Sequence, residues 1–265
     1  HDPFNDPILG GIMPRYEPAG DAFQQASSSS NVKNTAEELG ETFPEYLSQP
    51  NPDLLQVQLP DPALFTPPQN DFQQLVLNRR SHRRYDTEAS LSLAELGYLL
   101  QMTQGLRDAA QPQKLTRRYV ASAGSRHPFE TFLAIQRVEG LEPGIYHYLP
   151  QHHTLELWKP GLEALQSAHA ATFNQKQVIN SAVTFFWVAE VYRTSWRYGM
   201  RAYRYIYMDA GHVCQNLYLA AESIGHGVCA IAAFDDELST TVFELDGKER
   251  FMAYMASVGK KLPAA

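Results

Sequence analysis

The residues best suited to chemistry are four arginines and a serine close together in Arg79-Arg80-Ser81-His82-Arg83-Arg84-Tyr85. The whole chain carries a net charge of -7. Several cations placed close together repel one another, and this repulsion raises the electrostatic free energy of the chain. An anionic ligand relieves it. Arginine also matches phosphate oxygens with two parallel hydrogen bonds. The segment therefore indicates a phosphate-binding site; a solvated basic helix end or a set of surface ion pairs is the alternative.

Three further segments have compositions that packing alone does not require. Small residues and hydroxyls in Ser122-Ala123-Gly124-Ser125 would let backbone amides approach a ligand closely, although a plain turn also explains them. Residues 225–236 run from a helix stop through small residues into a capped helix. If Tyr192–Arg204 is helical, four arginines share one face, where they would form ion pairs or grip an acidic partner: Arg193, Arg197, Arg201 and Arg204.

Several familiar motifs are missing from the sequence. It has no dinucleotide-binding glycine fingerprint, no P-loop and no Gly-x-Ser-x-Gly elbow. Its two cysteines, Cys214 and Cys229, match no zinc or redox spacing. His152-His153 lacks matching carboxylate or cysteine partners, so no metal site is predicted. His212 falls inside a predicted helix, where we expect it to be packed.

Composition also limits the partners. The net charge of -7 argues against nucleic acid, which needs a basic face. No apolar run approaches the roughly 20 residues of a membrane helix. Low cysteine usage fits a reducing compartment, so we expect a cytoplasmic protein that does not span a membrane. The start at His1 rather than Met fits a processed chain or a fragment.

The chain divides near residue 70. Eleven of the seventeen prolines lie within residues 1–68, which favours an extended, poorly packed N-terminal arm over residues 1–69. A partly ordered arm that lies on a partner subunit fits equally well. Residues 70–265 show regular periodicity and are expected to form one domain.

Helix and strand signals alternate along this domain. We predict helices capped by Asn70 and Ser92, a third over Glu163–Phe173, a long one over Tyr207–Ser223 and a short one capped by Asp235. The predicted strands are Thr131–Val138, Ile145–Tyr148, Thr154–Trp158, Ala182–Val191, Gly227–Ala233 and Phe251–Val258. The nearly all-apolar fourth strand should be covered on both faces. This pattern predicts a layered α+β domain.

Taken in order, these segments resemble the nitroreductase superfamily of FMN enzymes, and specifically its SagB-type branch. The arginine segment resembles the superfamily's N-terminal phosphate motif. Ser122-Ala123-Gly124 resembles the branch's Ser-Ala-Gly turn, with Ala121 where proline is usual. Four more segments are similar to the branch, and the likeness spans about residues 70–261: Glu139–Tyr148, Asp209–Leu217, Ala233–Asp236 and Ser257–Lys260.

The resemblance implies a nitroreductase-like fold, with a central, mainly antiparallel sheet flanked by helices. It also implies a homodimer with two FMN molecules at the interface. The residues implied to hold the phosphate and ribityl oxygens are Arg79, Arg80, Ser81 and Arg83, with Lys260 and Lys261 adding charge. Those implied to approach the flavin from the partner chain are Ser122, Ala123, Gly124 and Ser125. Those implied to line the ring near N5 are Ile231, Ala232 and Ala233.

The implied reaction is hydride transfer between flavin N5 and a small-molecule or peptide-derived substrate. Branch members that oxidise azolines use a Lys-Tyr pair where this chain has Arg197-Tyr198. Arginine stays protonated in proteins, so Arg197 is a poor general base. We hypothesise that Arg197 anchors an anionic group or polarises a carbonyl, with Tyr198 as a proton relay. The alternatives are an NAD(P)H-dependent nitro- or quinone reductase, and a flavin-binding subunit without turnover of its own.

Overall fold

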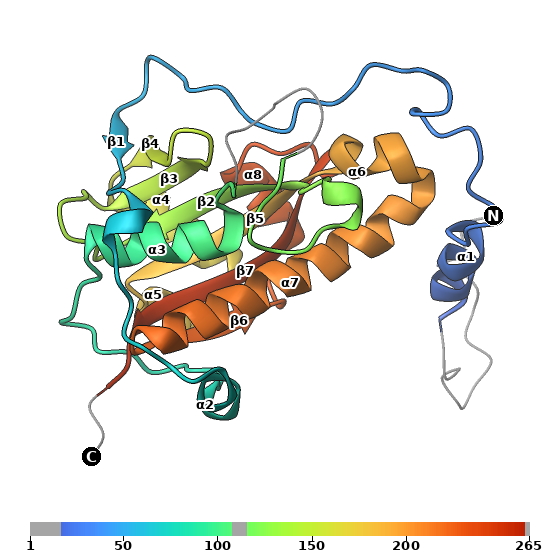
Figure 1. Ribbon diagram of the computed structural model, residues 1–265. Coiled ribbons are helices and arrows are strands. Elements are labelled where there is room, and N and C mark those ends of the chain that lie inside the picture. Colours follow the sequence, from blue (N-terminus) through green and yellow to red (C-terminus); the bar gives the residue numbers. More distant parts are fainter. Residues whose placement is uncertain (1–16, 108–115, 263–265) are drawn as a thin grey trace, which may run out of the picture.

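A computed structural model describes residues 17–107 and 116–262 of the chain. Its centre is an antiparallel sheet of seven strands, with α3 and α7 on one face and α4, α5 and α8 on the other (Figure 1). In neighbour order the strands are β1 (Gln56–Gln58), β4 (Thr154–Pro160), β3 (Gly144–Leu149), β2 (Phe129–Ile135), β5 (Val183–Glu190), β7 (Arg250–Lys260) and β6 (His226–Ile231). The helices are α1 (Pro18–Ala26), α2 (Phe72–Asn78), α3 (Leu93–Gln104), α4 (Leu162–Ala171), α5 (Lys176–Ile179), α6 (Val191–Tyr198), α7 (Ala202–Ser223) and α8 (Asp236–Val242).

The sheet separates two apolar cores, and β5 contributes to both. Phe185 and Trp187 face the core shared with α3 and α7, whereas Phe186 and Val188 face the core shared with α4 and α8. All four side chains are fully buried, so the expectation of a strand covered on both faces is confirmed. The predicted α+β class with a mainly antiparallel sheet is likewise confirmed.

The helix caps follow local side-chain chemistry, with one correction. Ser92 forms the predicted capping box at the start of α3, and Asp235 accepts from the backbone of Leu238 to cap α8. The cap of α2 is Asp71, not Asn70, since the Asp71 carboxylate accepts the Gln74 N–H at 3.1 Å. The Asn70 amide instead donates to the backbone carbonyl of residue 223, at the end of α7.

The first predicted helix is also less buried than its apolar face suggests. Phe72 is 70% exposed and Val76 is 47% exposed, because α2 projects from the domain (Figure 1). The region Tyr192–Arg204 is not one helix: α6 ends before Gly199, whose φ of 49° breaks the helix, and α7 begins at Ala202. The four arginines of this region therefore do not share one continuous face.

The described part of the N-terminal arm, residues 17–69, crosses the domain from α1 to β1 (Figure 1). Tyr46, Leu47 and Leu59 are buried, at 1%, 4% and 2% exposure. The short β1 then pairs with β4 at the sheet edge, with Gln56 opposite Glu156. The arm is thus fixed to the domain at its middle and at its end.

Candidate functional site

The arginine segment lies along β6 as an additional sheet edge. The backbone N–H of His82 donates to the Val228 carbonyl at 2.8 Å, and Ser81 forms a parallel bridge to the same residue. Gly227 permits this approach, because a Cβ there would lie 2.6 Å from the His82 Cβ. Further on, Tyr85 forms an antiparallel bridge to Lys261. The segment and the end of β7 are thereby brought together, as the sequence suggested.

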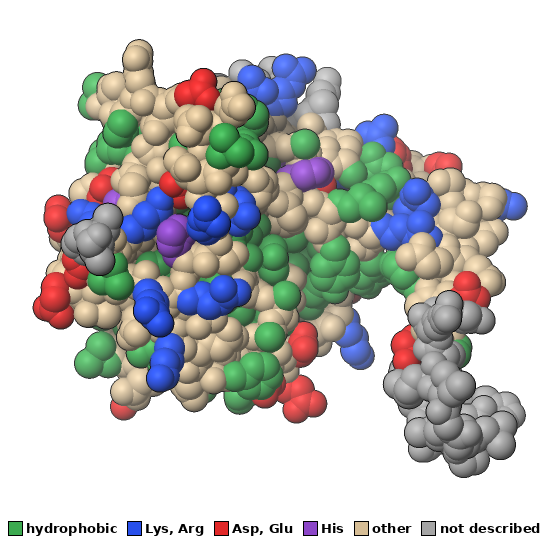
Figure 2. Space-filling model, turned by 90° about the horizontal axis from the view of Figure 1, so that it is seen from below, with side chains coloured by type: hydrophobic (Ala, Val, Ile, Leu, Met, Phe, Trp, Pro, Cys, Tyr) green, Lys and Arg blue, Asp and Glu red, His purple; other side chains and the backbone are tan. Residues whose placement is uncertain are grey.

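This edge carries an excess of positive charge. Within the described residues, no ion pair involves Arg79, Arg80, Arg83, Arg84 or Lys260, whereas Lys261 is neutralised by Glu222 at 2.7 Å. The alternative of a set of surface ion pairs is therefore not what the arginine segment shows within the described chain. Figure 2 shows Lys and Arg side chains gathered on this side of the molecule beside a histidine.

His82 adds an unsatisfied polar group to this edge. Burial, and then the nearby charge of Lys261, lower the pKa of its imidazole. Its Nε2 is buried without a hydrogen-bond partner in the described structure. The edge therefore combines cations without carboxylate partners and a buried imidazole nitrogen that can still hydrogen-bond to a ligand.

Tyr218 of α7 joins the arginine segment to β6, a role that no sequence pattern indicated. Its hydroxyl lies 2.9 Å from the Ser81 hydroxyl and accepts the backbone N–H of Ala230 at 2.8 Å. The Arg79 guanidinium lies over its ring, 5.2 Å from the centroid. Tyr218 itself is 8% exposed, whereas Ser81 is exposed and Arg79 is half-buried, so the group reaches from the core to the surface.

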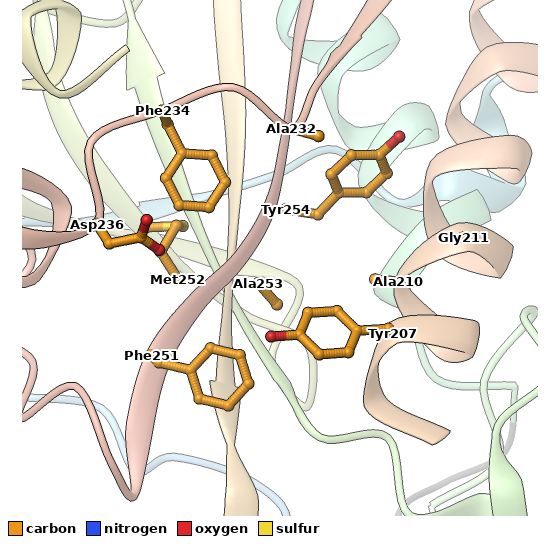
Figure 3. Close-up of a pocket in the computed structure, with 10 residues that line it drawn as sticks. All are labelled: Tyr207, Ala210, Gly211, Ala232, Phe234, Asp236, Phe251, Met252, Ala253 and Tyr254. Carbon is orange, nitrogen blue, oxygen red and sulfur yellow. The ribbon is translucent and has the colours of Figure 1, made fainter. Parts of the chain in front are cut away.

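A hollow of about 430 Å³ opens where β6 ends, and Figure 3 shows aromatic rings from α7 and β7 around it. Of the residues implied to line a flavin ring, Ala232 lines this hollow; Ala233 is exposed next to it and Ile231 is buried in β6. Ala232 is four residues beyond Val228, about 13 Å along the strand. The full lining is Tyr207, Ala210, Gly211, Ala232, Phe234, Asp236, Phe251, Met252, Ala253 and Tyr254.

The Ser122–Ser125 turn is assembled against α7. Ser122 Oγ donates to Asp209 Oδ2 at 2.5 Å, and the Ala123 N–H donates to Oδ1 at 3.3 Å. Burial raises the pKa of the Asp209 carboxyl, while these two hydrogen bonds oppose the rise. Gly124 has a φ of 57°, and a Cβ there would meet the Tyr198 hydroxyl at 2.5 Å. The turn and the Arg197-Tyr198 pair therefore form one group.

Within one chain, this group is separate from the arginine segment and the hollow. Asp209, which holds the turn, precedes Tyr218 by nine residues, or about 14 Å along α7. Asp209 is also about 200° around the helix from Gly211, which lines the hollow, at roughly 100° per residue. The helix thus lies between the turn and the hollow.

The four arginines that follow β5 contact either a buried carboxylate of the sheet or residues of the N-terminal arm. Arg193 forms a buried ion pair with Glu130, and Arg197 Nε lies 3.3 Å from Glu37 Oε2. Arg201 and Arg204 donate to Ser27 at the end of α1. The ion-pair interpretation is confirmed for the first two arginines, while the other two make hydrogen bonds.

A buried charge cluster at the centre of the sheet was not recognised from the sequence. His147 lies 2.6 Å from Glu130 through Nε2 and 3.4 Å from Glu156 through Nδ1. Burial lowers its pKa, but the hydrogen bonds with the two carboxylates outweigh that effect and raise it to about 9. Burial raises the pKa of Glu130, but the adjacent Arg193 charge prevails and holds it well below its usual value.

Other expectations concern residues outside these groups. His212, expected to be packed, has a side chain that is 54% exposed and donates toward the Ala121 carbonyl at 3.1 Å. Cys214 and Cys229 are buried and unpaired. No group of metal-binding side chains occurs in the described residues. The helices described there are too short or too polar to cross a bilayer.

Comparison with known sequences gives a consistent match. The model of the family described as "Nitroreductase family" matches residues 76–260. A candidate nitroreductase of Methanocaldococcus jannaschii is 29% identical over 210 residues, which cover 79% of this chain and 98% of that protein. The trifolitoxin-processing protein TfxB of Rhizobium leguminosarum bv. trifolii is 30% identical over 135 residues, 49% of this chain and 36% of TfxB.

Solved structures share the fold. A candidate nitroreductase from Anabaena variabilis matches with a TM-score of 0.64 and 26% identity, covering 80% of this chain and 42% of that one. A chain of the Escherichia coli microcin synthetase McbBCD complex, with truncated pro-MccB17 bound, matches with a TM-score of 0.58 and 20% identity over 92% of both chains. A candidate nitroreductase from Desulfovibrio desulfuricans in complex with FMN matches with a TM-score of 0.51 and 15% identity, over 73% and 87% of the two chains.

Proposed function

This chain belongs to the nitroreductase family, whose members are flavin oxidoreductases, and from that premise we propose that it is an FMN-dependent dehydrogenase of the SagB type. Its substrate would be a small molecule or a peptide-derived group. The observation that carries the proposal is the layout of β6: unpaired cations lie beside one end and a hollow lined by small and aromatic residues lies at the other. A phosphate joined to a flat ring fits that layout.

The described residues fit FMN in chemical type. Arg79, Arg80 and Arg83 offer guanidinium groups without a carboxylate partner, and Ser81 presents a hydroxyl held by Tyr218. Lys260 adds a further cation. Lys261 contributes less than expected, because Glu222 neutralises it. At the other end, Ala232 and Ala233 are exposed and lack bulk, so their backbone can approach a ring.

When bound, FMN would supply hydride transfer at its N5 atom. The protein's part is to fix the cofactor and place the substrate. Arg197 stays charged and so would anchor an anionic group or polarise a carbonyl, while the Tyr198 hydroxyl would hold or move a proton beside it. We propose these as the two catalytic residues, with Ser122, Ala123, Gly124 and Ser125 forming the adjacent wall.

A second copy of the chain would complete the site. The turn and Arg197-Tyr198 lie across α7 from the hollow of their own chain, so they are placed to serve the flavin of another. The outer face of α7 supports such a partner, because Tyr207 and Met208 are each 57% exposed beside the exposed Gly211. Exposed apolar residues on α2 add to the surface that a homodimer would bury.

Similarity to TfxB and to the microcin synthetase fold fits the SagB-type branch. Arg197 stands where the azoline-oxidising members of that branch have the lysine of their Lys-Tyr pair, so azoline oxidation with a lysine base is not expected here. Similarity along nearly the whole length of the M. jannaschii protein favours a second candidate, an NAD(P)H-dependent nitro- or quinone reductase. The low cysteine content and the two buried thiols fit a cytoplasmic location.

The deciding experiment starts with the absorbance spectrum of the protein as isolated. We expect a flavin spectrum, release of FMN on denaturation, and a thermal stability that rises with added FMN. A colourless protein that gains no stability from FMN contradicts both enzyme proposals. Stopped-flow mixing with NADPH then separates the two enzyme proposals. Rapid bleaching of the flavin absorbance supports the reductase. A flavin that NADPH does not bleach, in a protein that turns over a candidate substrate, supports the dehydrogenase. If NADPH does not bleach the flavin and no candidate substrate is turned over, the protein is a passive flavin-binding subunit.

A further inference from the structure

The N-terminal arm lies directly beside the two proposed catalytic residues. The backbone N–H of Glu37 donates to the Trp196 carbonyl at 2.8 Å. In return, the Trp196 indole N–H donates to the Glu41 carbonyl at 3.1 Å. These reciprocal bonds fix this part of the arm to α6, the helix that ends in Arg197-Tyr198.

Arg126 ties the same part of the arm to the Ser122–Ser125 turn. Its side chain is 1% exposed, and its Nε donates to the Gly124 carbonyl at 2.9 Å. Its guanidinium lies over three aromatic rings, two from the arm and one from α6: Tyr46 at 4.8 Å, Phe43 at 5.6 Å and Trp196 at 5.8 Å. Buried cation–π contacts of this kind hold a segment firmly. The arm, α6 and the turn therefore form one packed unit.

The unit places one carboxylate against the proposed anchor. Glu37 Oε2 lies 3.3 Å from Arg197 Nε, and neither Nη group of the guanidinium donates a hydrogen bond within the described residues. The two side chains are 37% and 42% exposed, so a ligand can reach them. An exposed ion pair of this kind is weak and exchanges readily. Arg197 is thus balanced in charge while keeping the edge that can bind a second carboxylate.

We propose that Glu37 is a specificity-determining residue, an internal counter-ion that sets which anions Arg197 accepts. This proposal rests on the proposed function, in which Arg197 anchors the substrate. Because Glu37 cancels the long-range attraction of Arg197, a simple anion gains little there. A ligand carboxylate that forms two parallel hydrogen bonds to the Nη edge gains enough to share the guanidinium with Glu37 or to displace it. The substrate class this selects is a carboxylate-bearing molecule.

The test is calorimetric titration of the FMN-loaded protein with benzoate, with benzamide as the uncharged probe. Replacing Glu37→Gln removes the counter-ion and keeps its shape. We expect it to tighten benzoate binding about two- to fivefold and to leave benzamide unchanged. Glu41→Gln is the matched control, because it removes the same charge from an exposed arm residue whose bond to Trp196 uses only the backbone.

The gain must also depend on Arg197. In an Arg197→Gln background, Glu37→Gln should no longer alter benzoate binding, whereas an undiminished gain there would place the effect elsewhere. An equal gain in Glu41→Gln, no gain in Glu37→Gln, or weaker binding would each overturn the proposal. Flavin absorbance of every variant is recorded separately. A wild-type protein that binds no flavin would contradict the proposed function, and the benzoate comparison, made then on the protein as isolated, would still decide the role of Glu37.

Discussion

The hydroxyl of Tyr218 lies 2.9 Å from that of Ser81, so one side chain of α7 joins the arginine segment to the core. The same hydroxyl accepts the Ala230 N–H of β6. The phosphate end of the proposed site and the strand that leads to the hollow are therefore held by a single buried group. A shift of Tyr218 would therefore move both the arginine segment and β6.

Replacing Tyr218→Phe tests that connection. The change leaves the Ala230 N–H without a partner, so we expect the free energy of unfolding to fall by about 1–3 kcal/mol. Loss of the Ser81 contact should also weaken FMN binding. Urea denaturation of the apoprotein and fluorescence titration with FMN measure the two effects. Tyr119→Phe, which removes a hydroxyl from a 40% exposed residue, should change neither.

A second prediction separates the arginines of one segment. Arg83→Gln should weaken FMN binding roughly 10- to 100-fold, because charge-assisted bonds to phosphate are lost. Arg84→Gln removes the same charge one position later and should have little effect. Riboflavin, which lacks the phosphate, should bind both variants like the wild-type protein. Equal losses in the two variants would mean that only the general positive field matters.

Much of the fold could be predicted because its signals are local. The Ser92 capping box and the Asp235 cap each depend on neighbours in sequence, and the structure contains both. The apolar run of β5 could be predicted because burial on both faces removes the need for polar residues. The likeness of ordered segments then indicated the fold as a whole.

What the sequence could not indicate are contacts between distant segments. Tyr218 and Glu37 take their roles from partners far away along the chain, which no spacing rule reveals. The break at Gly199 was missed because the arginine spacing favoured one continuous helix. The cluster around His147 was missed because alternate strand residues become neighbours only once the sheet forms.

That cluster predicts how stability depends on pH. His147 has a folded pKa of about 9, above its ordinary value near 6.5, so the folded state binds its proton more tightly. Its contribution is fully present below pH 6.5 and is lost as pH rises through about 9. We expect the free energy of unfolding to fall by up to about 3 kcal/mol over that window. Chemical denaturation at several pH values measures it.

The matched variant for this window is His147→Gln, which cannot titrate. It should be less stable than the wild-type protein at pH 6 and should lose its pH dependence between 6.5 and 9. His152→Gln removes a histidine from the loop between β3 and β4 and should keep the wild-type slope. An unchanged slope in His147→Gln would assign the pH dependence to another group.

The last prediction concerns the position at which the chain departs from the azoline-oxidising members of the SagB-type branch that it resembles. Lysine can be tuned by burial to act as a base, whereas arginine stays protonated. Arg197→Lys should therefore gain azoline-peptide oxidation that the wild-type protein lacks, with FMN content unchanged because the substitution leaves the phosphate-binding arginine segment and the residues at the end of β6 in place. Product mass spectrometry under aerobic turnover measures the gain. Wild-type oxidation of azoline peptides that is lost in Arg197→Ala but kept in Arg197→Lys would contradict the anchoring role, because a base would then be at work at that position.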